Sequence, residues 1–317
     1  MQNTKKFCNT LLVMGYQASG KSSYAHDIPG VYLNRDTVGG KVTSLLPMMQ
    51  EALDMGKDVV LDNTFPTVES RAPFIELGKK YGYVDCFWVK TSLEDAQINA
   101  LHRMWERYDR LFLDPDSIKN MNVKDPNMFP VAALFAYRNS FEKPTMAEGF
   151  NFIKSIPFVR KPKAGYNNSA VIFDYDGTLR DVPENAAYKF PTTPDDVRLM
   201  PNRKEKIKQL KESGILILGI SNQSGIARDQ VSEETVKKCF DVTNELLGAD
   251  IDVVYCPHGV PPRCYCRKPQ SGLGVLLIEK YKLDPSKCLY IGDQTTDKTF
   301  AKRLGFQYTD QSDYFKN

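Results

Sequence analysis

The sequence predicts an α/β protein of two domains, each a parallel sheet flanked by helices. At 317 residues the chain is long enough for about two hydrophobic cores. Short apolar runs alternate with amphipathic stretches along most of it, which is typical of parallel strands joined by helices. A polar segment rich in helix-breaking residues, "RKPKAGYNNS", predicts a linker near the middle. We therefore expect domains at residues 1–160 and 170–317, with residues 161–169 between them.

Buried strands are expected wherever a short apolar run is bounded by polar or turn residues. In the first domain the runs are residues 10–14, 58–62 and 83–89. In the second domain they are residues 170–174, 215–221, 252–256 and 288–293. Helices are expected at residues 40–56 and 202–214, because each amphipathic pattern ends in a glycine that can close a helix.

Composition excludes some classes of protein and leaves others open. No apolar run approaches the roughly 18 residues that a membrane helix needs. The net charge of +3 neither requires nor excludes a nucleic-acid partner. Aromatic residues make up 11% of the chain, but no stretch clearly interleaves them with basic residues as a base-stacking surface would. Seven cysteines, in a chain whose first residues show no secretory pattern, predict a reducing, cytoplasmic compartment.

A glycine-rich loop follows the first predicted strand. The segment "GYQASGKS" fits the pattern G-x-x-x-x-G-K-[ST] and precedes a predicted helix, so its backbone N–H groups can face nucleotide phosphates. Lys21 would neutralise the β and γ phosphates of ATP, and Ser22 would hold Mg²⁺. The predicted ATP and Mg²⁺ site comprises Gly15, Ser19, Gly20, Lys21, Ser22 and Ser23. The alternative is a glycine turn with a surface lysine.

Two aspartates, Asp36 and Asp62, lie at or just beyond the ends of apolar runs in this domain. Strand ends in such sheets line the ligand crevice. Phosphoryl transfer needs both a positioned metal ion and an oriented hydroxyl nucleophile. We therefore predict that Asp36 is the general base and that Asp62 contributes to the Mg²⁺ shell. A helix-capping or turn aspartate is the alternative for Asp36.

Three arginines in "LHRMWERYDR" are spaced four and three residues apart, which places Arg103, Arg107 and Arg110 on one face of a predicted helix. A cationic face of this kind could close over the γ phosphate as a lid and stabilise the charge that develops during transfer. The alternative is a set of surface salt bridges, since Glu106 is within reach of Arg103 and Arg110.

Residues 8–160 resemble the kinase domain of polynucleotide kinase 3′-phosphatases, which phosphorylate 5′-hydroxyl ends of DNA or RNA. The similar segments are "GYQASGKSS", "NRDT", "LDNTFPTVESR", "LEDAQIN" and "YRNSFEKPTMAEGFNFIKSIPF". The resemblance implies that Asp36 is the general base for the 5′-hydroxyl and that Lys21 and Ser22 hold ATP and Mg²⁺. It also implies that Arg103 and Arg107 belong to a lid.

In the second domain, the apolar start of "VIFDYDGTL" leads into two aspartates, Asp174 and Asp176. Alternation along an extended chain puts both carboxylates on one side. Such a pair repels itself unless a cation lies between the two groups or one of them is protonated. Bound Mg²⁺ would leave Asp174 as the nucleophile on phosphorus and Asp176 as the acid and then the base.

Two further strand ends carry matching chemistry. Ser221 and Asn222 can hydrogen-bond a phosphoryl oxygen, and Asp293 and Asp297 can complete the Mg²⁺ shell with the aspartate pair. Lys268, beside Arg267 in "CRKP", would supply positive charge to the phosphoenzyme. Each has an ordinary alternative as a capping serine or a solvated lysine. Together and in this order they resemble the four motifs of haloacid-dehalogenase-type phosphatases.

Three thiols and one imidazole lie within eleven positions, at Cys256, His258, Cys264 and Cys266. This set suits a closed tetrahedral Zn²⁺ site, and four protein ligands would leave no position for chemistry, so we predict a structural role. The alternative is a group of free or packing cysteines. The loop resembles the zinc loop of histidinol-phosphate and heptose-bisphosphate phosphatases.

The combined prediction is a bifunctional enzyme that phosphorylates 5′-hydroxyl ends and removes 3′-phosphates from DNA or RNA. The resemblance implies a nucleic-acid ligase as the enzyme that acts next. Between Thr178 and Pro201 the insertion is too short for a large cap, so a polymer end could enter the site. One alternative is a kinase fused to a phosphatase for a small sugar or histidinol phosphate. Another is a nucleotide-sensing module that binds nucleic acid.

Overall fold

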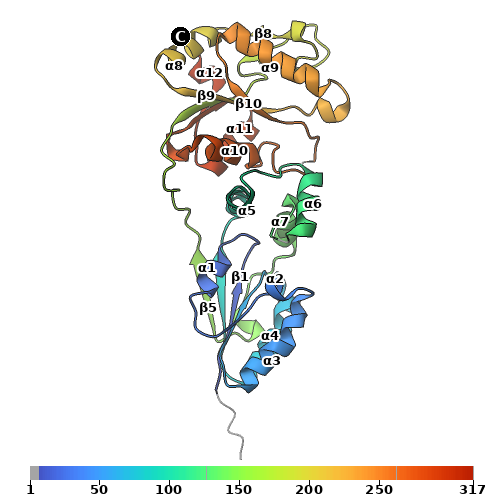
Figure 1. Ribbon diagram of the computed structural model, residues 1–317, viewed down its shortest axis with the longest axis vertical. Helices are drawn as coiled ribbons and strands as arrows, with labels where there is room; N and C mark the ends of the chain where they lie inside the picture. The colour runs from blue at the N-terminus through green and yellow to red at the C-terminus, as the bar shows by residue number, and fades with distance from the viewer. Residues whose placement is uncertain (1–6, 126, 262, 317) are drawn as a thin grey trace, which may run out of the picture. The chain divides into compact units, whose positions relative to one another are not determined.

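Two five-stranded sheets organise the chain, one in each of two units (Figure 1). The computed structural model describes residues 7–125, 127–261 and 263–316. The first unit comprises residues 1–100 and 120–160, and the second comprises residues 101–119 and 161–317. The expected fold class, two parallel sheets flanked by helices, is confirmed. None of the described helices combines the length and apolar character that crossing a membrane requires.

The first sheet has the strand order β2-β3-β1-β4-β5, and each neighbouring pair is parallel. Its strands are β1 (Thr10–Met14), β2 (Val31–Leu33), β3 (Val59–Asp62), β4 (Val84–Lys90) and β5 (Phe152–Pro157). The three central strands coincide with the predicted apolar runs, whereas β2 has only three residues and β5 includes exposed polar residues, so neither was predicted as a strand. Parallel pairing brings the carboxyl ends of β1, β2 and β3 to one edge, where the glycine-rich loop begins.

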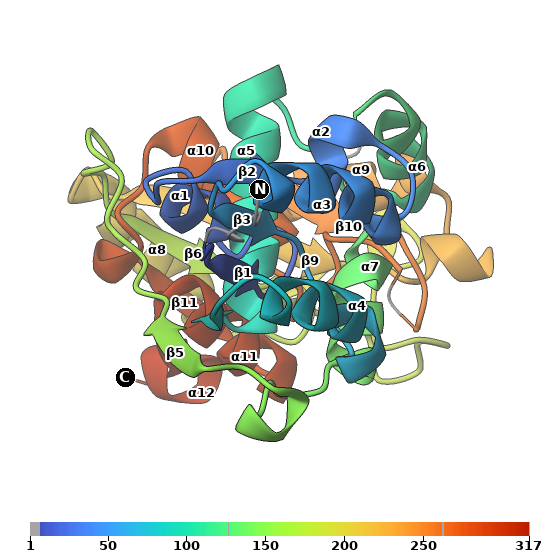
Figure 2. The same ribbon diagram turned by 90° about the horizontal axis from the view of Figure 1, so that it is seen from below.

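Helices and short 3₁₀ segments connect these strands. They are α1 (Lys21–Ala25), α2 (Arg35–Val38), η1 (Val42–Leu45), α3 (Leu46–Asp54), α4 (Val68–Lys79), α5 (Leu93–Tyr108), α6 (Pro115–Lys124), α7 (Val131–Ser140) and η2 (Met146–Glu148). Figure 2 shows α3 and α4 alongside the first sheet, which they contact. The helix expected over residues 40–56 is α-helical only from Leu46 to Asp54, where Pro47 occupies the first turn. A proline there has no N–H to donate and favours a helix start.

The second sheet has the order β10-β9-β6-β11-β12 and is also parallel throughout. Its strands are β6 (Ala170–Phe173), β9 (Leu216–Asn222), β10 (Asp252–Cys256), β11 (Leu289–Gly292) and β12 (Gln307–Asp310). The four predicted runs match the first four of these strands. Strand β6 is buried at every position and lies at the centre, so the residues that follow it emerge in the middle of the sheet edge.

Helices cover both faces of this second sheet. Figure 1 shows α8 (Arg203–Glu212), α9 (Glu233–Leu247) and α12 (Gln311–Tyr314) on one face, and α10 (Gly272–Tyr281) and α11 (Thr295–Leu304) on the other. Helix α8 fits the prediction for residues 202–214, and Gly214 has a φ of 68° just beyond its end. Two short antiparallel strands, β7 (Arg180–Asp181) and β8 (Arg198–Leu199), pair beside the sheet. The 3₁₀ segments are η3 (Pro194–Asp196), η4 (Ile226–Arg228) and η5 (Pro285–Lys287).

A buried carboxylate, Glu279 of α10, joins three parts of the second unit. It accepts hydrogen bonds from His102, Tyr166 and Lys163, and the Lys163 Nζ lies 2.7 Å from its Oε1. Burial by itself would raise the pKa of Glu279, but these hydrogen bonds lower it to about 2. The ionised form is therefore favoured by folding, and the cluster fixes residues 163–166 and His102 to α10.

Glu279→Gln is expected to lower the free energy of unfolding by about 3 kcal/mol at pH 7, since it removes the charge that its donors require. The folded pKa lies below the usual 4.5, so this stabilisation is present above pH 4.5 and is lost as the pH falls towards 2. Chemical denaturation across this pH range measures both effects. The exposed Glu245→Gln is the matched control, with an expected change within about 0.5 kcal/mol. An equal loss in both variants would contradict the assignment.

Candidate functional site

The glycine-rich loop between β1 and α1 has the backbone of a phosphate cradle. Gly15 has a φ of 149° and Gly20 a φ of 86°. A Cβ on Gly15 would lie 2.8 Å from the carbonyl oxygen of Val89, so only glycine fits there. Lys21 Nζ donates to the carbonyl oxygen of Tyr16 at 2.7 Å, which folds the lysine along the loop. Ser19 is buried, and among the described residues its Oγ has no hydrogen-bond partner.

Asp62, at the end of β3, faces this loop. Its Oδ2 accepts hydrogen bonds from Ser22 Oγ at 2.7 Å, Tyr32 Oη at 2.7 Å and Asn34 Nδ2 at 3.2 Å. Its Oδ1 is buried, with no hydrogen-bond partner in the part of the chain that the structure describes. A buried carboxylate oxygen without a partner is costly unless a ligand completes it. A hydroxyl and an open carboxylate oxygen side by side are the donors that Mg²⁺ prefers.

Asp36 lies in the first turn of α2, near this pair of residues. Asn34, not Asp36, caps the helix, because Asn34 Oδ1 accepts from the backbone N–H of Asp36 at 2.7 Å. The same Asn34 side chain donates to Asp62. The Asp36 carboxylate is exposed and pairs with the neighbouring Arg35. Asn34 thus links the backbone of Asp36 to the carboxylate of Asp62.

The arginines predicted to share a helix face do not all lie on a helix. Helix α5 contains Arg103 and Arg107 but ends at Tyr108, and Asp109 turns the chain with a φ of 51°. The prediction that Arg110 continues this face is therefore wrong, because a left-handed residue ends the helical repeat. Arg110 instead lies over the ring of Phe112, 4.6 Å from its centroid. Glu106, the alternative partner of these arginines, pairs with Lys163 at 3.1 Å.

In the second unit, carboxylates from the ends of two strands and from the first turn of α11 meet. One oxygen from each of Asp174, Asp293 and Asp297 lies within 4.8 Å of the others, close enough to share one metal ion. Gly177 makes room for this approach, since a Cβ on it would lie 2.6 Å from Asp293 Oδ2. Its φ of 80° also favours glycine. The sequence prediction that Asp174, Asp293 and Asp297 come together agrees with this geometry.

Lys268 balances the charge of these carboxylates. Its Nζ lies 2.8 Å from Asp174 Oδ1 and 2.7 Å from Asp297 Oδ1, and it donates to Tyr290 Oη at 2.9 Å. Burial opposes the charge on Lys268, but Asp174, Tyr290 and Asp297 together raise its pKa well above its usual value. Burial also raises the pKa of Asp174, to about 7, although Lys268 counteracts this effect. A bound cation would favour the ionised nucleophile.

The carboxylate of Asp176 faces other partners. Its Oδ1 lies 2.8 Å from Nε of Arg180, and its Oδ2 accepts from Gln223 Nε2 at 2.6 Å. Asp176 was predicted to be a metal ligand, but it is not part of the group formed by Asp174, Asp293 and Asp297. The reason is that Arg180 and Gln223 engage both of its carboxylate oxygens. Arg180 and Gln223 are buried. The sequence analysis missed both, since neither residue type at those positions signals a contact across the fold.

Ser221 and Asn222 complete the pocket. Ser221 Oγ accepts from Gln223 Nε2 at 2.8 Å, and Asn222 Oδ1 accepts from the backbone N–H of Lys268 at 3.0 Å. The cavity has a volume of about 50 Å³. Its lining comprises Asp174, Asp176, Ser221, Asn222, Lys268, Gln294, Thr296 and Asp297. This is room for a small group, bounded by one cation and several oxygen and amide groups.

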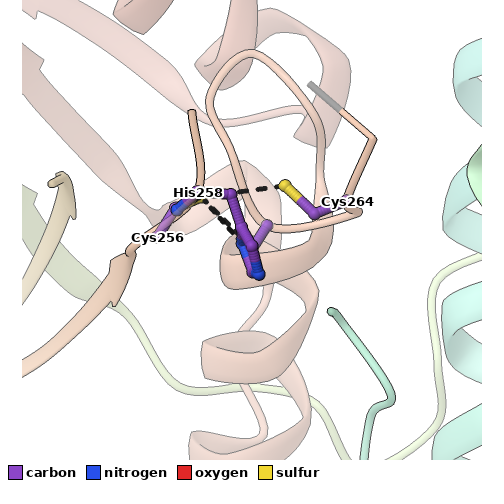
Figure 3. A group of neighbouring side chains, drawn as sticks. Cys256, His258 and Cys264 are labelled. Atoms are coloured by element: carbon purple, nitrogen blue, oxygen red, sulfur yellow. Dashed lines mark hydrogen bonds between the residues drawn. The ribbon is translucent and has the colours of Figure 1, made fainter. Parts of the chain in front are cut away.

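The predicted cysteine and histidine ligands also come together, at the end of β10 and in the loop that follows it. Sγ of Cys256 lies 3.7 Å from Sγ of Cys264 and 3.5 Å from Nδ1 of His258, and Figure 3 shows these side chains converging. Cys266 Sγ lies 3.2 Å from both Cys256 Sγ and His258 Nδ1. Hydrogen bonds to Cys256 and Cys264 raise the pKa of Cys266 far above its usual value. Three thiolates could therefore exist this close together only with a cation between them, and the donor set fits zinc.

A family model matches most of the second unit. The family model "Polynucleotide kinase 3 phosphatase" matches residues 169–315. A probable D-glycero-D-manno-heptose-1,7-bisphosphate 7-phosphatase of Thermoplasma volcanium is 32% identical over 140 residues, covering 42% of this chain and 92% of that protein.

Two solved structures are also similar. The D,D-heptose 1.7-bisphosphate phosphatase from B. bronchiseptica, complexed with magnesium and phosphate, is 26% identical with a TM-score of 0.41 and covers 44% of this chain and 78% of that one. A chain of the Pnkp1/Rnl/Hen1 RNA repair complex is 16% identical with a TM-score of 0.33 and covers 98% of this chain and 97% of that one. The family match falls on the unit that carries the carboxylate site. The chain belongs, through this unit, to the haloacid-dehalogenase-type phosphatases and matches their polynucleotide kinase 3 phosphatase family.

Proposed function

We propose that the protein heals nucleic-acid ends by adding phosphate to 5′-hydroxyl ends and removing it from 3′-phosphate ends. The observation that carries the proposal is that one chain holds two separate groups of residues suited to binding phosphate. One is the glycine-rich loop with Ser22 and the open oxygen of Asp62. The other is the carboxylate group around Lys268 in a unit that matches the polynucleotide kinase 3 phosphatase family.

The phosphatase step follows from the second site. Asp174 attacks phosphorus, and the bond from phosphorus to the 3′-oxygen breaks as Asp176 donates a proton to that oxygen. Water then attacks the aspartyl phosphate, Asp176 takes its proton, and inorganic phosphate leaves. Ser221 and Asn222 orient the phosphoryl oxygens, and Lys268 offsets their charge. Mg²⁺ held by Asp174, Asp293 and Asp297 would supply further neutralisation of charge on the phosphoryl group.

The kinase step follows from the first site. The loop from Gly15 to Ser23 would hold the phosphates of ATP, with Lys21 beside the β and γ groups. Ser22 and Asp62 would hold Mg²⁺, which neutralises charge on those phosphates. Asp36 would accept the proton of the 5′-hydroxyl as its oxygen attacks the γ phosphorus. The lid role of Arg103 and Arg107, which belong to the other unit, stays a prediction.

A wild-type assay tests the proposal directly. The substrate is an oligonucleotide with a 5′-hydroxyl and a 3′-phosphate, incubated with ATP labelled in the γ position and Mg²⁺. We expect both label incorporation at the 5′ end and release of inorganic phosphate from the 3′ end. Neither product should form when EDTA removes Mg²⁺. A ligase that joins 5′-phosphate and 3′-hydroxyl ends is the class of enzyme that would consume the product.

A second candidate for the phosphatase substrate is a small sugar bisphosphate, because the Thermoplasma relative is named for one. The same assay distinguishes the two candidates when heptose bisphosphate is added as a competing substrate. A kcat/KM higher for the sugar than for the oligonucleotide would favour the second candidate. No 3′ release from the oligonucleotide would overturn the end-healing proposal.

A further inference from the structure

An exposed aromatic pair lies on the segment between β7 and β8. The rings of Tyr188 and Phe190 stack with centroids 5.2 Å apart and planes 20° apart. Tyr188 retains 37% of its surface exposed, whereas Phe190 is half-buried. Lys189, between them in the chain, is exposed. Aromatic and basic side chains therefore lie together on one short surface segment.

Phe190 anchors this pair beside the phosphatase site. A Cβ on Gly225 would lie 2.8 Å from the Phe190 ring, so the ring packs directly on that glycine. Gly225 is two residues beyond Gln223, whose Nε2 donates to Asp176 at 2.6 Å. Arg228 belongs to the same turn, since its backbone N–H donates to the Gly225 carbonyl oxygen at 3.3 Å. Its side chain is exposed and adds a positive charge there.

We propose that Tyr188, backed by Phe190, is a stacking platform for a nucleobase of the strand whose 3′-phosphate occupies the carboxylate site. The proposal rests on the end-healing function. It explains how the carboxylate site would select a nucleic-acid strand over a sugar phosphate. A tyrosine held rigid by a second ring offers a π-face to any base at little entropic cost. Lys189 and Arg228 flank the pair with positive charge suited to backbone phosphates.

The experiment compares three phosphatase substrates. They are a 3′-phosphorylated oligonucleotide, the same oligonucleotide with an abasic 3′-terminal unit, and p-nitrophenyl phosphate. For Tyr188→Ala we expect the ratio of kcat/KM for the full oligonucleotide to kcat/KM for p-nitrophenyl phosphate to fall about 5- to 150-fold, which corresponds to the stacking contribution of about 1–3 kcal/mol. The loss should appear mainly in KM. Tyr188→Phe, which keeps the ring, should retain the wild-type ratio.

Tyr83→Ala is the matched control, since Tyr83 is 56% exposed, pairs with the ring of Phe7 and belongs to the first unit. An unchanged ratio in Tyr188→Ala would overturn the platform while end healing stands. An equal fall for all three substrates would also overturn it, since that pattern means a damaged fold. Failure of the wild type to release phosphate from the oligonucleotide, with p-nitrophenyl phosphate still hydrolysed, would instead overturn the end-healing function itself.

A salt titration gives an independent readout of the flanking charge. The logarithm of the affinity for the oligonucleotide should fall with the logarithm of salt concentration, and Arg228→Gln should reduce that slope by about 1 if its side chain contacts a phosphate. Tyr188→Ala removes no charge, so its slope should equal that of the wild type. A changed slope in Tyr188→Ala would contradict a stacking role.

Discussion

Asp174→Asn is expected to abolish release of the 3′-phosphate, with a loss of about 10⁴-fold or more, while 5′ phosphorylation continues at the wild-type rate. The amide cannot form the aspartyl phosphate, so the covalent route is lost. The variant should fold, because Lys268 keeps its contact with Asp297 at 2.7 Å. Single-turnover assays on the oligonucleotide with a 5′-hydroxyl and a 3′-phosphate measure both activities. The exposed Asp250→Asn is the matched control and should leave both rates unchanged.

Lys21→Ala tests whether 5′ phosphorylation can be lost while 3′ release is retained. It should lower 5′ phosphorylation by about 10²- to 10³-fold, the effect of removing one preorganised positive group from a transferring phosphoryl, and spare 3′ release. Lys57→Ala, an exposed lysine of the same unit, is its control. Loss of both activities in either variant would contradict two independent sites, and retention of labelling in Lys21→Ala would contradict the role of the glycine-rich loop.

Removal of zinc is expected to destabilise the second unit and to reduce its activity. A metal that binds only the folded state contributes about 4 kcal/mol when its free concentration is 1,000 times Kd. Its loss should lower the Tm by about 10 °C. The loop it closes leads directly into Lys268, whose backbone is hydrogen-bonded to Asn222 and whose side chain contacts Asp174, so 3′ release should fall as well.

Cys264→Ser and chelator-treated wild type should both show this behaviour, with elemental analysis falling from about one zinc per chain in the untreated protein. Cys288→Ser is the matched control, because Cys288 is buried but lies outside the cluster. Wild-type protein that holds no zinc and keeps its full Tm in chelator would refute the metal assignment. A drop in Tm for Cys288→Ser as large as for Cys264→Ser would show that packing, not metal, is responsible.

The sequence predicted the central strands and the residues at their ends because both depend on local patterns. Apolar runs such as residues 170–174 can bury both faces only inside a covered parallel sheet. The residue after such a strand emerges at the edge where ligands bind, so Asp62 and Asp174 were placed without knowledge of distant contacts. The cysteine and histidine cluster could also be predicted from the sequence, since Cys256 and Cys266 are only ten positions apart. The edge strands β2 and β5 were missed because β2 has only three residues and β5 carries exposed polar residues among its apolar ones.

Contacts between residues far apart in the chain could not be predicted in this way. Gln223 reaches Asp176 across 47 positions, and the Tyr188–Phe190 pair acquires its place only because Phe190 packs on Gly225. For Arg110 the helical spacing in the sequence predicted a place on the arginine face, but the turn at Asp109 ends the helix before it. The sequence by itself therefore determined the central strands of the two sheets and the residue types at their ends, since periodicity and spacing are local. Only the tertiary structure decided which side chains meet there, because packing between distant segments, and not spacing, sets those contacts.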